Sequence, residues 1–329
     1  MYNLTINSNC WKKEKEMPEI ITMGELLVEI MRPGEDIPLE KTDYFRGPFP
    51  SGAPGIFVST AARLGHEAAI ISGVGKDDFG KCILDRLRHD GVDISRVLVS
   101  DEGNTGVAFV EYSRSGDRKF LFYMDGSPCV MAKVPDQDNN LKNVKVMHIM
   151  GCSLMSSLAF GREIVKTMYM MKELGARISF DPNLRLEMVK DPTVMDLLQE
   201  VFANTSILLP GVAELLFLTG ESDLEKAIKK AFKNPVLEIL ALKNGSEGSR
   251  IYTNGELVAE QSVYPVEVLD PTGAGDSFDA ALLCGLLEGR TLKDAAAMGS
   301  AAGALNTAAF GPMEGKITRK TIEEMMKSK

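Results

Sequence analysis

The stretch Asp270-Pro271-Thr272-Gly273-Ala274-Gly275-Asp276 opens a long apolar helical pattern that runs to Leu287. Three small residues in a row leave the backbone open to close approach by a ligand. N–H groups at a helix start point out of the helix, and the helix dipole adds partial positive charge there. The stretch therefore predicts an anion hole for a phosphoryl group during its transfer.

Asp276 would lie beside the phosphate bound in such a hole, where the two negative charges repel each other. A carboxylate at this place fits general-base catalysis, because it can take the proton from an attacking hydroxyl group. The alternative is a glycine-rich first turn in which Asp276 only interacts with the helix dipole.

Strand and helix patterns alternate along most of the chain, which predicts an α/β fold with a mostly parallel sheet covered on both faces. Residues 25–31 alternate weakly and predict further strand structure after a glycine turn at residue 24. A proline-rich segment and a β-hairpin pattern break the rhythm, and we expect a small β lid from about 25–50 and 100–130. The predicted strands are 19–24, 68–72, 144–150, 177–181, 207–209 and 237–243; the predicted helices are 55–64, 78–90 and 161–174, with two more that begin near 273 and 292; the proline-rich segment is 32–50 and the hairpin 105–124.

The composition argues against several classes of protein. The 329 residues include 37 Lys and Arg against 46 Asp and Glu, which gives a net charge of −9 with histidine neutral. Nucleic-acid binding needs a basic face, so we expect no nucleic-acid partner. We also expect no membrane partner, because no apolar run approaches the roughly 18 residues that suggest a span.

The N-terminal residues 1–18 have neither a strand pattern nor the apolar stretch of a secretory signal. We expect a disordered or loosely attached extension there, with Met17 as a candidate natural start. The cysteines are odd in number and far apart, which favours reduced thiols in a cytoplasmic protein. His148 lies four residues before Cys152, but a buried strand explains it better than a Cys/His nucleophile pair. The cysteines are Cys10, Cys82, Cys129, Cys152 and Cys284.

One glycine-rich segment nearly matches two phosphate-binding motifs. Residues 75–82 have almost the spacing of a P-loop, but Cys82 stands where Ser or Thr should hold magnesium. Asp77 and Asp78 would repel phosphate, and Asp78 also replaces the third glycine of a dinucleotide fingerprint. We therefore expect neither a P-loop nor a dinucleotide-binding site in this segment.

Five segments together resemble the motifs of the ribokinase-like (PfkB) sugar kinase family, in the family's order and over roughly residues 19–315. The opening stretch is similar to the family signature Asp-Thr-x-Gly-Ala-Gly-Asp, with Pro271 in place of the Thr. The others are the sugar-site segment Gly47-Pro-Phe-Pro-Ser-Gly52-Ala-Pro-Gly55, the early turn Gly73-Val-Gly-Lys-Asp-Asp-Phe-Gly80, the Asp-x-Asn-x-Arg motif in Phe180-Asp181-Pro182-Asn183-Leu184-Arg185, and the nucleotide-side loop Leu242-Lys243-Asn-Gly245-Ser-Glu-Gly248. The resemblance implies a ribokinase-like three-layer α/β/α kinase domain over residues 19–329, with a β lid.

The resemblance implies an ATP-dependent kinase in which Asp276 is the general base. Gly273, Ala274 and Gly275 would form the anion hole. Phosphoryl transfer needs positioning and charge neutralisation, so we expect Mg²⁺ to accompany ATP and to be held mainly by phosphates and waters.

The nucleotide side departs from the family pattern at one position. Glu214 matches the acidic end of an Asn-x-x-Glu motif and would contact Mg²⁺ through water, but Gly211 stands where the family has the Asn. Asp270, with nearby backbone carbonyls, could hold a monovalent cation such as K⁺. The other implied nucleotide-binding residues are Lys243, Gly245, Gly248 and Thr272.

On the sugar side, Glu29 stands where the family more often has an Asp that binds sugar hydroxyls. Gly52 and Ala53 would let the backbone approach the sugar. Ile56 stands where the family usually has Asn, which argues against ribose as the substrate. Asn183 belongs to the implied substrate site as well.

Three further side chains are candidates for the substrate site. Arg185 would bind the γ-phosphate or a substrate carboxylate, with a surface salt bridge as the alternative. Arg118 and Tyr123 on the hairpin would close over the sugar, with an exposed hairpin as the alternative.

The implied activity is transfer of a phosphate to a primary hydroxyl of a ketohexose or a 2-keto-3-deoxy sugar acid. The most similar members are tagatose-, fructo- and ketodeoxygluconate kinases, and the resemblance also suggests a homodimer through the lid. One alternative is a nucleoside kinase, with Phe49 and Phe57 beside the base. The other is a non-catalytic sugar sensor, against which the retained Asp276 argues.

Overall fold

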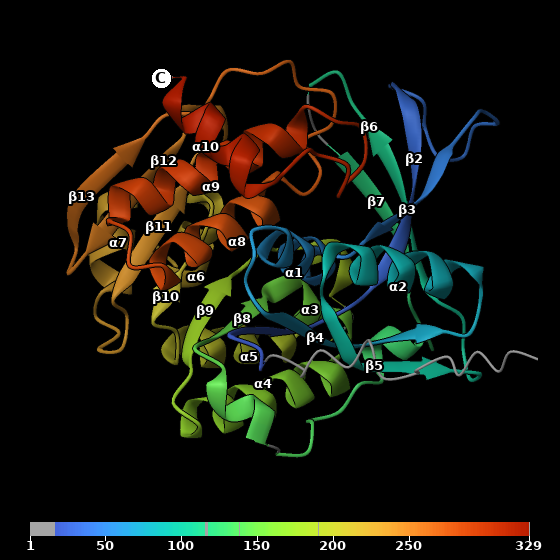
Figure 1. Ribbon diagram of the computed structural model, residues 1–329, viewed down its shortest axis with the longest axis horizontal. Helices are drawn as coiled ribbons and strands as arrows, with labels where there is room; N and C mark the ends of the chain where they lie inside the picture. The colour runs from blue at the N-terminus through green and yellow to red at the C-terminus, as the bar shows by residue number, and fades with distance from the viewer. Residues whose placement is uncertain (1–16, 116–117, 138, 190, 329) are drawn as a thin grey trace, which may run out of the picture.

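The computed structural model describes residues 17–115, 118–137, 139–189 and 191–328. The expected N-terminal extension lies outside the described residues, apart from its last two positions. The described chain forms a layered body with a small second sheet beside it (Figure 1).

A nine-stranded sheet forms the centre of the body, in the order β13-β12-β11-β10-β9-β8-β1-β4-β5. The pairs from β5 to β11 are parallel, and the β12–β13 hairpin adds two antiparallel strands at one edge. The prediction of a mostly parallel sheet is confirmed. The strands are β1 Ile20–Met23, β4 Ala68–Gly75, β5 Asp93–Ser100, β8 Val146–Met150, β9 Arg177–Asp181, β10 Ile207–Leu208, β11 Ile239–Lys243, β12 Ser249–Thr253 and β13 Glu256–Gln261.

Helices cover both faces of this sheet, as Figure 1 shows. One group packs on one hydrophobic core and the other group on a second core. Within the described residues, no helix is long and apolar enough to cross a lipid bilayer. The first group is α1 Ala53–Arg63, α2 Asp78–Asp90, α8 Ala274–Leu287, α9 Leu292–Thr307 and α10 Arg319–Lys327; the second is α4 Leu158–Glu173, α5 Val194–Ala203, α6 Val212–Thr219 and α7 Leu224–Ala231, while the short α3 Gly151–Ser156 follows β8.

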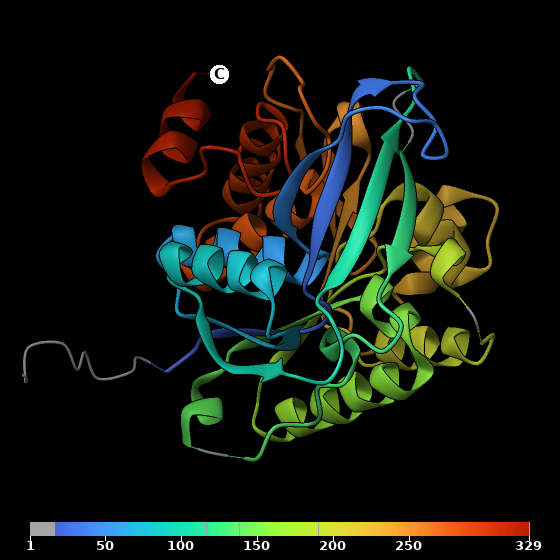
Figure 2. The same ribbon diagram turned by 90° about the vertical axis from the view of Figure 1, so that its right-hand side faces the viewer.

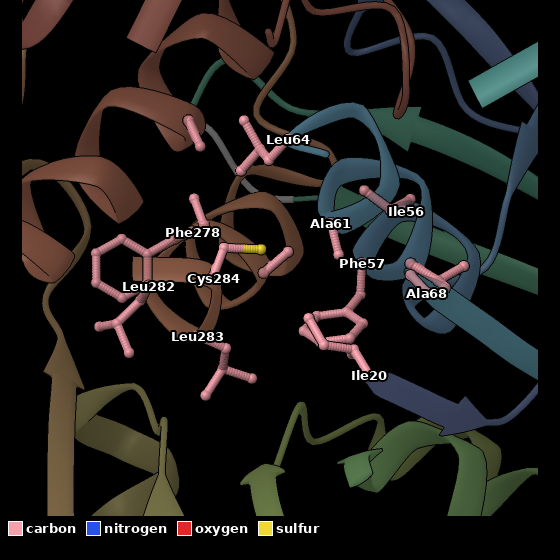
Figure 3. Packing of buried hydrophobic residues seen from close by; sticks show 14 of the residues in the cluster. Ile20, Ile56, Phe57, Ala61, Leu64, Ala68, Phe278, Leu282, Leu283 and Cys284 are labelled. Carbon is pink, nitrogen blue, oxygen red and sulfur yellow. The ribbon is translucent and has the colours of Figure 1, made fainter. Parts of the chain in front are cut away.

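The two cores follow from the alternation of side chains along the central strands. Ile20 of β1 and Val146 of β8 belong to one core, whereas their neighbours Ile21 and Met147 belong to the other. Successive side chains of a strand point to opposite faces, and a parallel sheet is covered on both. Figure 3 shows Ile20 in the first core, among side chains of α1 and α8.

A second sheet of four strands has the order β3-β2-β6-β7, with β2 and β6 parallel and the outer pairs antiparallel. Its strands are β2 Leu27–Glu35, β3 Arg46–Ser51, β6 Gly106–Tyr112 and β7 Arg118–Tyr123. In both views these blue and teal strands project away from the layered body (Figures 1 and 2). The two segments that break the α/β rhythm thus form one sheet, which we call the small sheet.

The prediction of strand structure over residues 25–31 is confirmed from Leu27 onward. β1 ends at Met23, and β2 begins at Leu27 in the small sheet. Gly24 lies at the crossing point, where an added Cβ atom would come within 2.4 Å of both Pro54 and Ser153 side chains. The chain leaves the large sheet at this tightly packed position and enters the small sheet. Residues 32–50, expected as loop or edge structure, contain the end of β2 and most of β3.

Candidate active site

The predicted anion-hole residues lie at the N-terminus of α8. Gly273 is the N-cap residue with φ +80°, a backbone conformation that favours glycine. A Cβ atom at Gly273 would lie 2.5 Å from the carbonyl oxygen of Pro312, so close packing also requires glycine. Ala274, Gly275 and Asp276 then form the first turn of α8, whose N–H groups have no partner inside the helix.

Two cavities meet at this turn. The smaller, of about 200 Å³, lies between the body and the small sheet; the larger, of about 420 Å³, lies on the other side of the turn. Lys243, Pro271 and Gly275 line both cavities. A phosphoryl group at this helix start could therefore pass between ligands in the two cavities. The other predicted residues lining the smaller cavity are Glu29, Gly52, Ala53, Arg118, Asn183, Arg185, Glu214, Thr272, Gly273 and Asp276, and those lining the larger include Gly245, Gly248 and Ala274.

Asp276 is 7% exposed and faces the smaller cavity. Its Oδ1 accepts a hydrogen bond from Nδ2 of Asn183 at 3.2 Å. Burial raises the pKa of Asp276 to about 7 and the charge of Asp181 adds to the shift, whereas Lys243 opposes it. A carboxyl group with a pKa near neutrality is suited to take a proton from a hydroxyl and later to release it.

Lys243 lies at the centre of a buried ion-pair network. Its Nζ donates to Oδ2 of Asp181 at 2.8 Å and to Oδ2 of Asp279 at 3.0 Å. Burial alone would lower the pKa of Lys243, but the two carboxylates outweigh burial and raise it, so the ammonium stays charged. The network joins the ends of β9 and β11 to α8. The sequence motifs include Lys243 and Asp181, but they identify neither Asp279 nor the ion pairs among the three residues.

Glu214 lies in the first turn of α6 and lines the smaller cavity. Its Oε2 accepts from the N–H of Gly211 at 2.7 Å and its Oε1 from the N–H of Leu184 at 2.9 Å. Burial raises the pKa of Glu214, and repulsion from Asp181 adds to the shift. Each oxygen keeps a lone pair for a water ligand, which fits an indirect contact with Mg²⁺. The described residues include no group of three or more His, Cys, Asp or Glu that would hold a metal alone.

Glu29 of β2 is 5% exposed and lines the smaller cavity. Its Oε1 accepts from the hydroxyl of Ser51 at 2.6 Å, whereas its buried Oε2 has no partner among the described residues. Burial raises the pKa of Glu29 to about 7, although the Ser51 hydrogen bond lowers it. An unpaired buried oxygen is costly, so a sugar hydroxyl would be a favourable partner.

Gly52 also borders the smaller cavity, directly before α1. Its φ is +98°, and an added Cβ atom would come within 2.4 Å of the carbonyl oxygen of Glu25. The backbone therefore fits only glycine here, which leaves the cavity floor free of a side chain.

The strand β7 presents alternate side chains to the smaller cavity. Arg118, Phe120 and Phe122 line it, whereas Tyr123 is 60% exposed and absent from its lining. The expectation that Tyr123 covers the sugar is therefore wrong, because neighbouring residues of a strand face opposite sides. Arg185 also lines the cavity, with its guanidinium carbon 5.6 Å from the centre of the Phe120 ring.

The sequence pattern missed one acidic residue of the smaller cavity. Glu25 is 4% exposed and accepts hydrogen bonds from Ser153 Oγ at 2.5 Å and Cys152 Sγ at 3.3 Å. Its burial raises the pKa of the carboxyl group. A charged residue between the apolar runs of β1 and β2 is the signal that could have identified it.

The aromatic slot suggested for a nucleoside is wrong in its residues. Phe57 is fully buried and stacks on His148, with ring centres 4.0 Å apart. Phe49 packs against Phe310 instead. His148 lies within the buried strand β8, as expected, and the described cysteines Cys82, Cys129, Cys152 and Cys284 are free thiols.

Comparison with known proteins agrees with this geometry. A model of the pfkB family carbohydrate kinases matches residues 50–319. The chain belongs to this family. It is therefore a carbohydrate kinase, a phosphotransferase whose acceptor is a sugar hydroxyl.

Relatives within this kinase family match over almost the whole chain. "Probable fructokinase-4" of Arabidopsis thaliana is 28% identical over 319 residues, which cover 94% of this chain and 96% of the relative. The apo structure of "a putative Ribokinase II" from E. coli is 38% identical with a TM-score of 0.88, covering 95% of this chain and all of that one. A second structure of that description, in complex with ATP and Mg²⁺, is 37% identical with a TM-score of 0.87 and the same coverage. The predicted ribokinase-like α/β fold is confirmed.

Proposed function

We propose that this kinase transfers the γ-phosphate of ATP to a primary hydroxyl of a ketohexose or a 2-keto-3-deoxy sugar acid. The observation that carries the proposal is the buried Asp276, with a pKa of about 7, in the first turn of α8 where the two cavities meet. The relatives named fructokinase and the related structure with ATP and Mg²⁺ support this choice of ligands.

ATP would occupy the larger cavity. Its walls include the apolar side chains of Val263, Tyr264 and Phe278, which suit the flat faces of a base. Gly245 and Gly248 leave room for the backbone to approach the ligand. The phosphates would then reach the N–H groups at the start of α8. Mg²⁺ would neutralise phosphate charge, held by the phosphates and, through water, by Glu214.

The sugar would occupy the smaller cavity. The unpaired Oε2 of Glu29 would accept a hydrogen bond from a sugar hydroxyl. Asp276, held by Asn183, would take the proton of the attacking hydroxyl. Arg118 and Arg185 would face the γ-phosphate or a substrate carboxylate, and a ketose would use only the first of these roles.

A coupled assay with Mg-ATP would test the proposal across ketohexoses, 2-keto-3-deoxy sugar acids and nucleosides. We expect turnover with a member of the first two classes, and sugar-independent ATP hydrolysis far slower than turnover. Turnover only with nucleosides, or with nothing, would contradict the proposal. The Arg185→Ala variant then separates the acceptors, because selective loss with an acid indicates a carboxylate contact and equal losses indicate the phosphate.

A further inference from the structure

The end of the small sheet contacts the loop that precedes the anion hole. The strand β6 ends at Tyr112, whose hydroxyl donates to Oδ1 of Asp270 at 3.0 Å and lies 3.4 Å from Oγ1 of Thr272. From the neighbouring strand, Nη1 of Arg118 donates to the same threonine oxygen at 3.2 Å. Two strands of the small sheet thus reach the residues directly before Gly273.

Asp270 connects three segments through one fully buried carboxylate. Its Oδ1 accepts from the N–H of Thr272 at 2.9 Å as well as from Tyr112, and its Oδ2 accepts from the N–H of Gly311 at 2.9 Å.

Aromatic rings also pack where the small sheet contacts the segment around Gly311. Phe310 lies next to Gly311, and its ring centre is 6.3 Å from that of Tyr112 and 5.9 Å from that of Phe49. The guanidinium carbon of Arg46 lies 4.4 Å from the same ring centre. These contacts would persist without the Tyr112 hydroxyl, so its hydrogen bond can be tested separately from the ring packing.

Thr272 transmits these contacts to the anion hole. Its N–H donates to Asp270, its carbonyl oxygen accepts from Asn306 Nδ2 at 2.6 Å, and its hydroxyl oxygen accepts from Arg118. The next residue is Gly273, which packs closely on Pro312. The orientation of the N–H groups at the start of α8 therefore depends partly on side chains of the small sheet.

We propose that Tyr112 is a positioning residue for phosphoryl transfer, which links the placement of the small sheet to the geometry of the anion hole through Asp270 and Thr272. The inference rests on the proposed function, because the sugar would bind between the small sheet and the body. The contacts of Tyr112 would then help to position both the sugar cavity and the phosphate site. Small misplacements of reacting groups can cost about 100-fold in rate.

The variant Tyr112→Phe removes only the hydroxyl and keeps the ring on Phe310. We expect its kcat to fall about 10- to 100-fold, while the KM for the sugar stays within about threefold, because the loss concerns alignment and not sugar binding. Tyr123→Phe on the exposed face of the same sheet is the matched control and should match the wild type. A kcat within about twofold of wild type, or a change confined to KM, would overturn the inference.

Hydrogen exchange of the ligand-free protein gives a readout that does not depend on activity. In Tyr112→Phe, amides of residues 270, 272–276 and 311 should exchange faster than in wild type and in Tyr123→Phe, while those of β8 and β9 stay unchanged. Unchanged exchange at residues 270 and 272–276, or faster exchange throughout the body, would contradict a positioning role. If the wild type phosphorylates no sugar, the proposed function fails while this measurement still decides the role of the contact.

Discussion

The two cavities beside α8 differ in the kind of groups that line them. The smaller is lined by buried ionisable side chains, among them Glu25, Glu29 and Asp276. The larger is lined mainly by apolar side chains and glycine backbone, with Phe278 and Gly245 as examples. Recognition of many hydroxyl groups requires polar side chains held in place, whereas a base and its phosphates can be bound by flat apolar walls and backbone N–H groups.

This contrast explains how a chain with a net charge of −9 can serve an anionic ligand. The anion would meet N–H groups of the first turn of α8, so a basic surface is not needed. On the sugar side, burial raises the pKa of Glu25, Glu29 and Asp276, which shows that their charged forms are held at a cost. Substitutions there should alter activity and stability in different ways.

The largest effect should follow removal of the base on the sugar side. Asp276→Asn keeps the size and hydrogen-bonding capacity of the side chain but cannot take up a proton. We expect kcat to fall about 10²–10⁴-fold with little change in the KM for ATP. Because the pKa of Asp276 is about 7, the wild-type rate should also decline as the pH falls below neutrality and the base becomes protonated.

Asp78→Asn is the matched control for this change. Asp78 also lies in the first turn of a helix that follows a glycine-rich turn, but it is exposed and outside both cavities. If Asp276 only interacted with its helix dipole, the two variants would lose similar amounts of stability and neither would lose much activity. Full activity of Asp276→Asn would rule out the base.

The second effect concerns the boundary between the cavities, where Lys243 borders both. Lys243→Met leaves the carboxylates of Asp181 and Asp279 buried, at 3% and 0% exposure, without their cation. We expect the free energy of unfolding in urea to fall by about 3–5 kcal/mol at pH 8, because an uncompensated buried charge is costly.

Lys145→Met breaks an exposed ion pair with Glu19 and serves as the control. Water and salt screen such a pair, so its loss should cost no more than about 1 kcal/mol. Equal losses for the two variants would show that the network around Lys243 contributes no more than a surface pair.

Local signals account for the parts of the fold that the sequence predicts correctly. Apolar runs such as 144–150 become central strands, and the glycine-rich start at 273 becomes the first turn of α8. The strands β5, β12 and β13 were not predicted, and β5 and β13 are the two edges of the large sheet. The residues of β5 and β13 are exposed or half exposed, and each strand has an apolar run of only three residues, so no long apolar run marks them.

The same holds for the candidate site: local sequence patterns predict some of its residues, but not the contacts between residues that lie far apart in the sequence. Glycine motifs identify Gly52 and Gly273 because backbone requirements act within a few residues. The partners of Lys243 and Tyr112 could not be predicted, since Asp279 lies 36 positions from Lys243 and Asp270 lies 158 positions from Tyr112. Only the folded chain brings these pairs together. The Lys243–Asp279 pair joins β11 to α8, and the Tyr112–Asp270 pair joins the small sheet to the loop before α8.

The smallest effect should come from Glu29 and should depend on pH. Its pKa is about 7 in the folded protein against 4.5 for the ordinary side chain, so the folded state binds the proton more tightly. The contribution of Glu29 to the free energy of unfolding therefore falls by about 2.5 kcal/mol as the pH rises from 5 to 8. Glu29→Gln cannot ionise, so its unfolding free energy in urea, relative to wild type, should rise by that amount between the two pH values.

The difference between two pH values matters more than either value alone, because the new amide N–H₂ group replaces the unpaired Oε2 and adds a pH-independent cost. Glu40→Gln is the control, since Glu40 is exposed and its charge is solvated in both states. Glu29→Gln should also raise the KM for the sugar. If its stability relative to wild type were the same at pH 5 and pH 8, Glu29 would not be a buried carboxyl group held ready for a hydroxyl, and the contrast between the two cavities would lose one of its main supports.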